Sequence, residues 1–230
     1  MKRRKLALFI AASLSLVVSR PATADITTGD VTGGTAKTAG GTFVKLVPPL
    51  TNPFGPPDSV GDDNFQSPNL FGFDEDQNIV IAAPINVDVG TAPTAGMTLA
   101  SQYIFFDPGP SQHMIGTVNF DADVIAIITS TGKLAASDFL ANTGVNYLNP
   151  GNRGLEAGDS VTISTTDPKQ IIFDTFASSP GDYVRVLTEF SPNAAAVPEP
   201  SSLPILGVGL AGIAACLYVR RRKNLNYSRD

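Results

Sequence analysis

Hydrophobic and polar residues alternate over much of residues 70–191, which is the pattern of half-buried β-strands. The segments with this pattern are rich in Val, Ile and Phe and end at turns; they span 78–90, 97–109, 116–132, 159–165, 169–177 and 182–190. Helical periodicity is scarce there, apart from one helical turn expected within 135–144. Short strands separated by turns at about 8–12-residue spacing predict an all-β fold.

The last of these segments, 182–190, alternates well, with Val184 and Val186 on one face and Arg185 and Glu189 on the other. An antiparallel sheet that packs one face on a core has this arrangement. We therefore predict a single β-sandwich with a jelly-roll-like topology. An immunoglobulin-like topology is the alternative, and the sequence does not separate the two.

The region before the strands, 25–69, is predicted to be a lead-in to the body. Residues 25–41 are small, polar and rich in Gly and Thr, so we expect them to be flexible. The prolines within 47–69 exclude a helix and most central strands, which predicts a long loop. Residues 192–202, after the strands, are predicted to be a linker.

An uncharged apolar run, 203–219, lies close to the C-terminus. As a helix it would span roughly 25 Å, the short end of what crosses a bilayer. The run is followed at once by four cations: Arg220, Arg221, Arg222 and Lys223. Because such clusters mark the cytoplasmic side of a span, we predict a transmembrane helix over 203–219 and a basic cytoplasmic tail over 220–230. A buried core helix is the alternative.

The N-terminus has the three parts of a secretory signal peptide. A basic start is followed by an apolar run over 6–18 and by Ala22-Thr23-Ala24, a cleavage site of the A-x-A type. We predict a signal peptide over 1–24, cut by signal peptidase after Ala24, which makes Asp25 the new N-terminus. An uncleaved anchor is the alternative. The predicted signal peptide and the predicted C-terminal span both place the body outside the cytoplasm.

The charge of the body differs from that of the whole chain. Residues 25–197 hold 6 Lys and Arg against 19 Asp and Glu, a net charge of −13, whereas the whole chain has −5. So acidic a body repels phosphate backbones, which argues against a nucleic-acid partner. Cys216 is the only cysteine, which excludes intramolecular disulfides and a Cys-based metal site.

The triplet Pro198-Glu199-Pro200 stands just before the apolar run. Its prolines keep the backbone extended and unpaired, as a processing enzyme requires. With the short span and the basic end, the triplet resembles the PEP-CTERM sorting signal of Gram-negative bacteria over residues 197–223. Residues 69–90 and 178–188 also resemble uncharacterised body domains attached to such tails, and this second resemblance implies no activity.

The resemblance to the sorting signal implies processing by an exosortase, an integral-membrane cysteine transpeptidase that would recognise Pro198, Glu199 and Pro200. It implies a precursor held transiently in the inner membrane with its body in the periplasm. The mature protein is then expected at the cell surface or in extracellular polysaccharide.

Candidate catalytic residues are few. His113 is the only histidine, and we expect it to be exposed in a Pro/Gly loop without the nucleophile and orienting acid of a triad. Asp121 and Asp123 share one face of a predicted strand, where solvated side chains are expected. Carboxylate pairs of this kind could serve glycoside hydrolysis, but an acidic chain always offers such pairs.

One segment suggests a calcium site. Asp74, Asp76 and Asn78 have the D-x-D-x-N spacing of the first half of a calcium loop, and Asp62 and Asp63 could add oxygen ligands from another loop. The Gly and the distal Glu of an EF-hand are missing. A charged turn is the alternative, and no other cofactor is expected.

The sequence thus favours an exported, non-enzymatic protein with a structural or adhesive role, for which polysaccharide is the candidate partner. A carbohydrate-binding module is one alternative, with Tyr103, Tyr147 and Tyr183 as the aromatic residues that could stack on sugars. A carboxylate-based glycoside hydrolase is the other.

Overall fold

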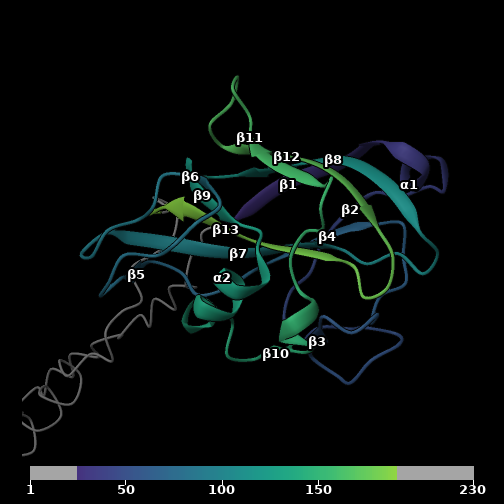
Figure 1. Cartoon of the computed structure of the whole chain (residues 1–230), viewed down its shortest axis with the longest axis horizontal. Coiled ribbons are helices and arrows are strands. Elements are labelled where there is room, and N and C mark those ends of the chain that lie inside the picture. Colours follow the sequence, from purple (N-terminus) through teal and green to yellow (C-terminus); the bar gives the residue numbers. More distant parts are fainter. Residues whose placement is uncertain (1–24, 191–230) are drawn as a thin grey trace, which may run out of the picture. The chain divides into compact units, whose positions relative to one another are not determined.

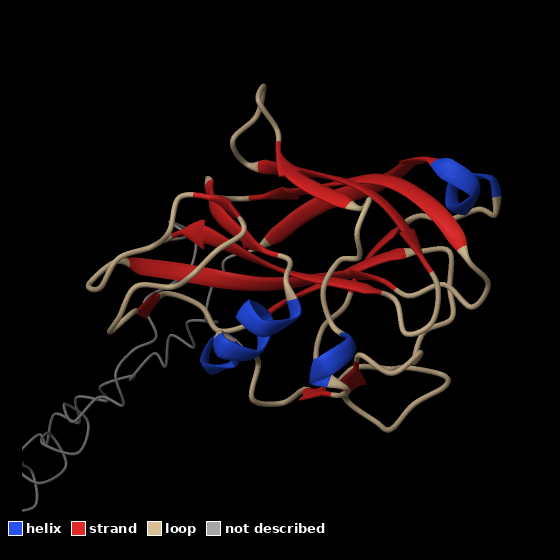
Figure 2. Cartoon of the chain, viewed as in Figure 1, coloured by secondary structure: helices blue, strands red, loops and turns tan. Residues whose placement is uncertain are grey.

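A computed structural model of the chain describes residues 25–190 and shows a β-rich body. The chain divides after residue 195 into two units, and the described residues belong to the first. Strands dominate this body, and its helices are short (Figure 2). The all-β prediction is confirmed.

Four strands form the smaller sheet, in the order β1-β8-β12-β11, and all neighbours are antiparallel. Their bounds are Ile26–Gly33 (β1), Gln112–Phe120 (β8), Gln170–Ala177 (β12) and Ser160–Ile163 (β11). Buried and partly exposed residues alternate along β8 and β12, as expected for strands with one face on a core.

The larger sheet has the order β2-β4-β7-β13-β9-β6, with β5 also paired to β7; only β2 and β4 are parallel. Its strands are Phe43–Lys45 (β2), Leu70–Asp74 (β4), Ile79–Val80 (β5), Val89–Gly90 (β6), Thr98–Phe106 (β7), Val124–Ile128 (β9) and Asp182–Glu189 (β13). A parallel pair, Ser59–Val60 (β3) with Asn146–Tyr147 (β10), stands apart. The helices are Gly34–Thr38 (α1), Thr131–Ala136 (α2), Asp138–Leu140 (η1) and Pro150–Asn152 (η2).

The two sheets pack face to face around one hydrophobic core (Figure 1). Val118 and Phe173 enter this core from the smaller sheet, and Ile104, Val184 and Val186 enter it from the larger. This is the arrangement of a sandwich. Seven strands in one sheet are more than either sheet of a simple jelly roll or immunoglobulin domain holds, so both topology names stay predictions.

A second core covers the outer face of the larger sheet. Phe105 and Leu187 of that sheet pack there with Leu50 and Phe65 from the loops and with Leu134 of α2. Figure 1 shows α2, β3 and β10 on this side of the sheet, away from β1, β8, β11 and β12. The central strands β7 and β13 are therefore buried on both faces, and the body has three layers rather than two.

The prediction of a flexible lead-in over 25–41 is wrong, whereas the long loop predicted over 47–69 is present and is interrupted only by β3. Ile26 pairs with Phe120 at the start of β1, and the side chain of Val31 is fully buried. The Pro-rich segment contributes β3 and part of the second core. Composition gave the wrong prediction for 25–41 because small residues pack well along an edge strand. In 47–69, the prolines are compatible with a loop that covers a sheet.

Two further boundaries differ from the sequence patterns. The predicted strand over 116–132 is split at 121–123 into β8 and β9, which belong to different sheets. The expected helical turn within 135–144 begins earlier, at Thr131 in α2, and continues into η1. Among residues 25–190, no helix is long and apolar enough to cross a membrane, and the predicted span over 203–219 lies outside the described residues.

Replacing Ile26 by Ala tests whether β1 is part of the fold. Ile26 is 2% exposed in the core between the sheets, so Ile26→Ala should lower the free energy of unfolding by about 2–4 kcal/mol. Ile172→Ala is the matched control, because Ile172 is 37% exposed and should cost about 1 kcal/mol or less. Urea unfolding of the full-length protein in detergent measures both. Equal, small losses would restore the lead-in prediction.

Candidate functional site

Several sequence-predicted sites lie outside the described residues, so the structure does not place them: Pro198, Glu199, Pro200, Ala22, Ala24, Arg220, Arg221, Arg222 and Lys223. Asp25, the residue predicted to follow the signal peptide, is described. It directly precedes β1.

Asp25 is tied to the folded body. The Lys45 ammonium of β2 donates to Asp25 Oδ1 and to the Ile26 carbonyl, each at 2.9 Å. It also lies 2.8 Å from Asp74 Oδ2 at the end of β4. The Asp121 N–H donates to the Asp25 carbonyl at 3.1 Å. The chain is thus fixed to both sheets from the predicted mature N-terminus onward.

The residues predicted to bind calcium occupy different surroundings. Burial raises the pKa of Asp74, and its contact with Lys45 offsets part of that effect. Burial, and next the charge of Glu75, raise the pKa of Asp76. Asn78 has a left-handed backbone with φ of 55°. Residues 25–190 contain no group of three or more His, Cys, Asp or Glu side chains that could hold a metal. A site on Asp74 would have to displace Lys45.

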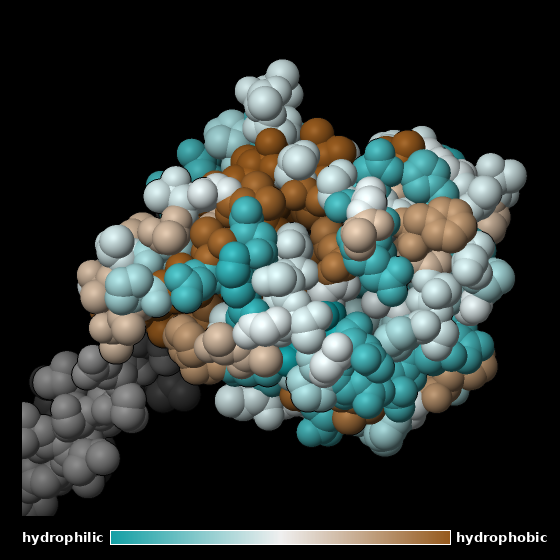
Figure 3. Space-filling view, viewed as in Figure 1, coloured by the Kyte–Doolittle hydropathy of each residue, from teal (hydrophilic) through white to brown (hydrophobic). Residues whose placement is uncertain are grey.

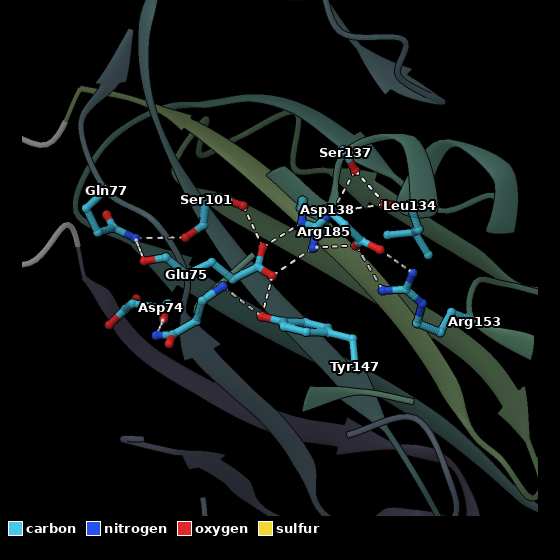
Figure 4. A network of polar contacts seen from close by, with 11 residues as sticks. Asp74, Glu75, Gln77, Ser101, Leu134, Ser137, Asp138, Tyr147, Arg153 and Arg185 are labelled. Carbon is cyan, nitrogen blue, oxygen red and sulfur yellow. Dashed lines mark hydrogen bonds and ion pairs between the residues drawn. The ribbon is translucent and has the colours of Figure 1, made fainter. Parts of the chain in front are cut away.

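The most extensive polar cluster is buried and centres on Arg185 (Figure 4). Glu75, just after β4, accepts two hydrogen bonds from the guanidinium: Nε to Oε2 at 2.6 Å and Nη2 to Oε1 at 2.8 Å. Both side chains are 0% exposed. Burial alone would lower the pKa of Arg185, but Glu75 raises it above its ordinary value. The expectation that Arg185 lies on a polar face is therefore wrong, because a second layer covers that face.

Residues of β7, β10 and η1, together with Ser137 between α2 and η1, complete this cluster. The Tyr147 hydroxyl of β10 and the Ser101 hydroxyl of β7 each donate to Glu75 at 2.6 Å. Ser137 directly follows α2, and its Oγ accepts a hydrogen bond from Arg185 Nη1 at 2.6 Å. Asp138 of η1 contacts Arg185 Nη2 at 3.3 Å. The cluster joins the larger sheet to the layer that covers it, so its chemistry is structural.

Asp138 also binds a second buried cation. Arg153, 1% exposed, donates Nη1 to Asp138 Oδ1 at 3.0 Å and Nη2 to Oδ2 at 2.7 Å. Sequence reasoning missed the roles of Arg153, Arg185 and Glu75. One signal was present for Arg185, since it interrupts a strand whose other residues are mostly apolar, and a cation at such a position needs a buried partner.

A polar pocket of about 340 Å³ lies between the loop around η2 and the turn before β13. Asp182 and Glu156 are its acidic residues. Asp182 is 3% exposed, and its Oδ2 has no hydrogen-bond partner. Burial, followed by the charges of Asp159 and Glu156, raises the pKa of Asp182 to about 7. A carboxyl group in this state can exchange a proton near neutral pH.

The tyrosines considered for sugar binding are in or against the second core. Tyr103 and Tyr183 are fully buried, and Tyr147 packs against Tyr103 while its hydroxyl donates to Glu75. They are therefore not placed to stack on an external ligand.

His113 lies at the start of β8, where its Nε2 is 2.7 Å from Asp174 Oδ1, and is not in the predicted loop.

Large apolar side chains are exposed at scattered positions: Val47, Phe54, Val80, Phe139, Ile172, Phe176 and Phe190. Figure 3 shows a face on which hydrophilic and hydrophobic residues are mixed, with hydrophobic ones gathered toward its upper centre. Ile172 and Phe176 lie on the same outward face of β12, with Asp174 between them.

Asp121 and Asp123 are partly exposed between β8 and β9, not on a strand.

Comparison with known families identifies one match. The PEP-CTERM protein-sorting motif matches residues 196–223. No curated protein and no solved structure matches the chain. The chain therefore carries this sorting motif at its C-terminal end. The motif implies exosortase as the processing partner, and export with membrane anchoring before processing.

Removing the Glu75 carboxylate tests the buried ion pair. Glu75→Ala should lower the free energy of unfolding by about 3–5 kcal/mol, because Arg185 keeps its charge without a partner. Asp30→Ala, in the exposed pair with Lys37, is the matched control and should cost below about 1 kcal/mol. Chemical denaturation measures both. A loss in Glu75→Ala no larger than in the control would mean that the pair does not hold the layers together.

The pKa of Asp182 predicts how stability depends on pH. Because folding raises it from 3.8 to about 7, folding favours the protonated acid, and stability present below pH 4 is lost as the pH rises through 7. Asp182→Asn should therefore be more stable than the native protein at pH 8, by on the order of 2 kcal/mol, and equal to it at pH 4. Thermal unfolding across this pH range measures the difference. A constant difference at every pH would contradict the assignment.

Proposed function

We propose that this chain is an exported, non-enzymatic protein that exosortase-type processing delivers to the cell surface or to the extracellular polysaccharide matrix. There its body has a structural or adhesive role. The observation that carries the proposal is the sorting motif over residues 196–223. In this view, exosortase supplies the chemistry, and the chain is its substrate.

The body supports a non-catalytic role through the way it uses its polar residues. The buried cations Arg185 and Arg153 are both engaged in ion pairs, and that of Arg185 with Glu75 and Asp138 joins the larger sheet to the layer that covers it. The outward face of β12 exposes Ile172 and Phe176, which suits contact with a partner surface. Sugar binding by stacked tyrosines is not part of the proposal, since those rings belong to the second core.

A glycoside hydrolase is the second candidate, favoured by one observation. The pocket that holds Asp182 also holds Glu156, and glycoside hydrolysis uses two carboxyl groups, one with a raised pKa. Incubating the native protein and Asp182→Asn with the host's own polysaccharide separates the candidates. Hydrolysis by the native protein that is lost in the variant would replace the non-enzymatic proposal.

Replacing Glu199 tests the sorting proposal in the native host. The native protein should yield a mature species that starts at Asp25, lacks everything beyond about Pro200 and lies outside the inner membrane. Glu199→Gln should keep the Arg220–Lys223 end and remain in the inner membrane, because the recognised carboxylate is gone. Intact mass and cell fractionation measure both properties.

Glu189→Gln is the matched control, since Glu189 is an exposed glutamate at the end of β13, outside the motif. It should be processed like the native protein. Unchanged processing of Glu199→Gln would refute recognition of the Glu199 carboxylate. A native protein that keeps its tail would refute the sorting proposal and make this a membrane-anchored periplasmic protein.

A further inference from the structure

The polar pocket beside the start of β13 contains a buried acid without a partner. Asp182 lines this pocket of about 340 Å³ and is 3% exposed. Its Oδ2 has no hydrogen-bond partner among residues 25–190, and the nearby Thr175 Oγ1 has none either. The pocket is large enough for a small ligand, and a buried carboxylate is costly unless a proton or a donor group reaches it. The unpartnered oxygen therefore indicates a ligand that donates hydrogen bonds.

The walls of this pocket are held in place before a ligand arrives. On one side, the Leu155 N–H donates to the Thr129 carbonyl at 2.8 Å. On the other side, the Gly181 N–H donates to the Ser178 carbonyl at 2.5 Å. Gly154 and Gly181 have φ of 113° and 89°, and a Cβ on either would lie 2.6 Å from a backbone oxygen. Fixed walls lose little conformational freedom when a ligand binds, so the pocket is preorganised.

The charged groups around the pocket favour a cationic ligand. Glu156 is the second acid of the lining. Burial, followed by the charges of Asp159 and Glu156, raises the pKa of Asp182 to about 7. Arg153 is the cation of the lining, but Asp138 accepts two hydrogen bonds from its guanidinium. An ammonium group carries three N–H donors and one positive charge, so it could satisfy Asp182 and reduce the repulsion between the acids.

The rest of the lining favours a sugar over an aliphatic amine. Asn152, Ser178 and Ser179 are exposed at the mouth of the pocket and offer amide and hydroxyl groups. Leu155 is the largest apolar residue of the lining, which holds no aromatic ring. A lysine or an alkylamine brings a run of methylene groups that needs apolar walls. The hydroxyl groups of a sugar ring donate and accept hydrogen bonds, which suits this lining.

We propose that this pocket binds an amino sugar with a free amine, whose ammonium group donates to Asp182 and Glu156. The inference rests on the proposed function and deepens its adhesive role, because the recognised polymer is then a cationic polysaccharide. The charge of the body fits such a polymer, since residues 25–197 hold 19 Asp and Glu against 6 Lys and Arg, a net charge of −13. Sorting is tested in the host and binding on the purified protein, so either can fail alone.

Calorimetric titration of the full-length protein in detergent tests the ligand. Glucosamine should bind at one site at pH 7 with a dissociation constant of about 1 mM, as expected for so small a ligand. Glucose and N-acetylglucosamine have the same ring without the ammonium group and should bind about tenfold or more weakly. Equal binding of glucose would overturn the proposal, and equal binding of n-butylamine would replace it by an aliphatic amine. Glucosamine has no glycosidic bond, so these outcomes do not depend on hydrolysis.

The proton on Asp182 gives a second readout. The ammonium group competes with this proton, so binding at pH 6 should release a proton, and affinity should fall about tenfold from pH 7 to pH 5.5. Glu156 and Asp159 are the other acids that act on Asp182, and Arg153 is the cation of the lining. Calorimetry in buffers of different ionisation enthalpy measures the release. Binding without proton release, at an affinity independent of pH, would place the ligand elsewhere and overturn the proposal.

Two variants locate the binding. Asp182→Asn should weaken glucosamine binding about tenfold or more and abolish the proton release, although it is expected to be the more stable protein at pH 8. Glu156→Gln, at an exposed position, should weaken binding about threefold and serves if Asp182→Asn fails to fold. Asp30→Asn is the matched control, because it removes the same charge from β1 in the smaller sheet and should bind like the native protein. The proposal is overturned if the pocket variants bind as this control does.

Discussion

The larger sheet is covered on both faces, and this constraint governs the rest of the body. A strand buried on both sides has no exposed face for a polar side chain, so Arg185 must find its partners inside. Glu75 meets that need with two hydrogen bonds, and Ser101 and Tyr147 satisfy the remaining carboxylate lone pairs. A buried pair of this kind contributes little net stability by itself, but leaving either partner alone is costly.

The same constraint explains why many aromatic residues lie in the second core. Phe71, Phe105 and Tyr183 stack with ring centroids 5.2–5.4 Å apart between the sheet and its covering layer. A protein without disulfides in its described body depends on such packing, because no covalent link restricts its unfolded state. Rings used in this way are lost to surface recognition. The surface of the body instead exposes scattered apolar side chains and carries a net negative charge.

The two kinds of functional evidence come from separate parts of the chain. The sorting motif lies at 196–223 and implies processing by exosortase, whereas residues 25–190 form the folded body. The contact of Asp25 with Lys45 makes the residue predicted to follow the N-terminal cut part of the folded body. Export, processing and folding therefore concern different residues, and a change in one part need not affect the others.

The sequence alone determined the sorting motif, because the motif is a contiguous stretch, residues 196–223, that is recognised from the order of its residues. It also determined the all-β class, because alternation is a local property of each strand. Only the tertiary structure decided that β1 belongs to a sheet and that Arg185 is buried. Each of these depends on contact between segments far apart in the chain, such as Glu75 with Arg185, and no local pattern records which segment covers which.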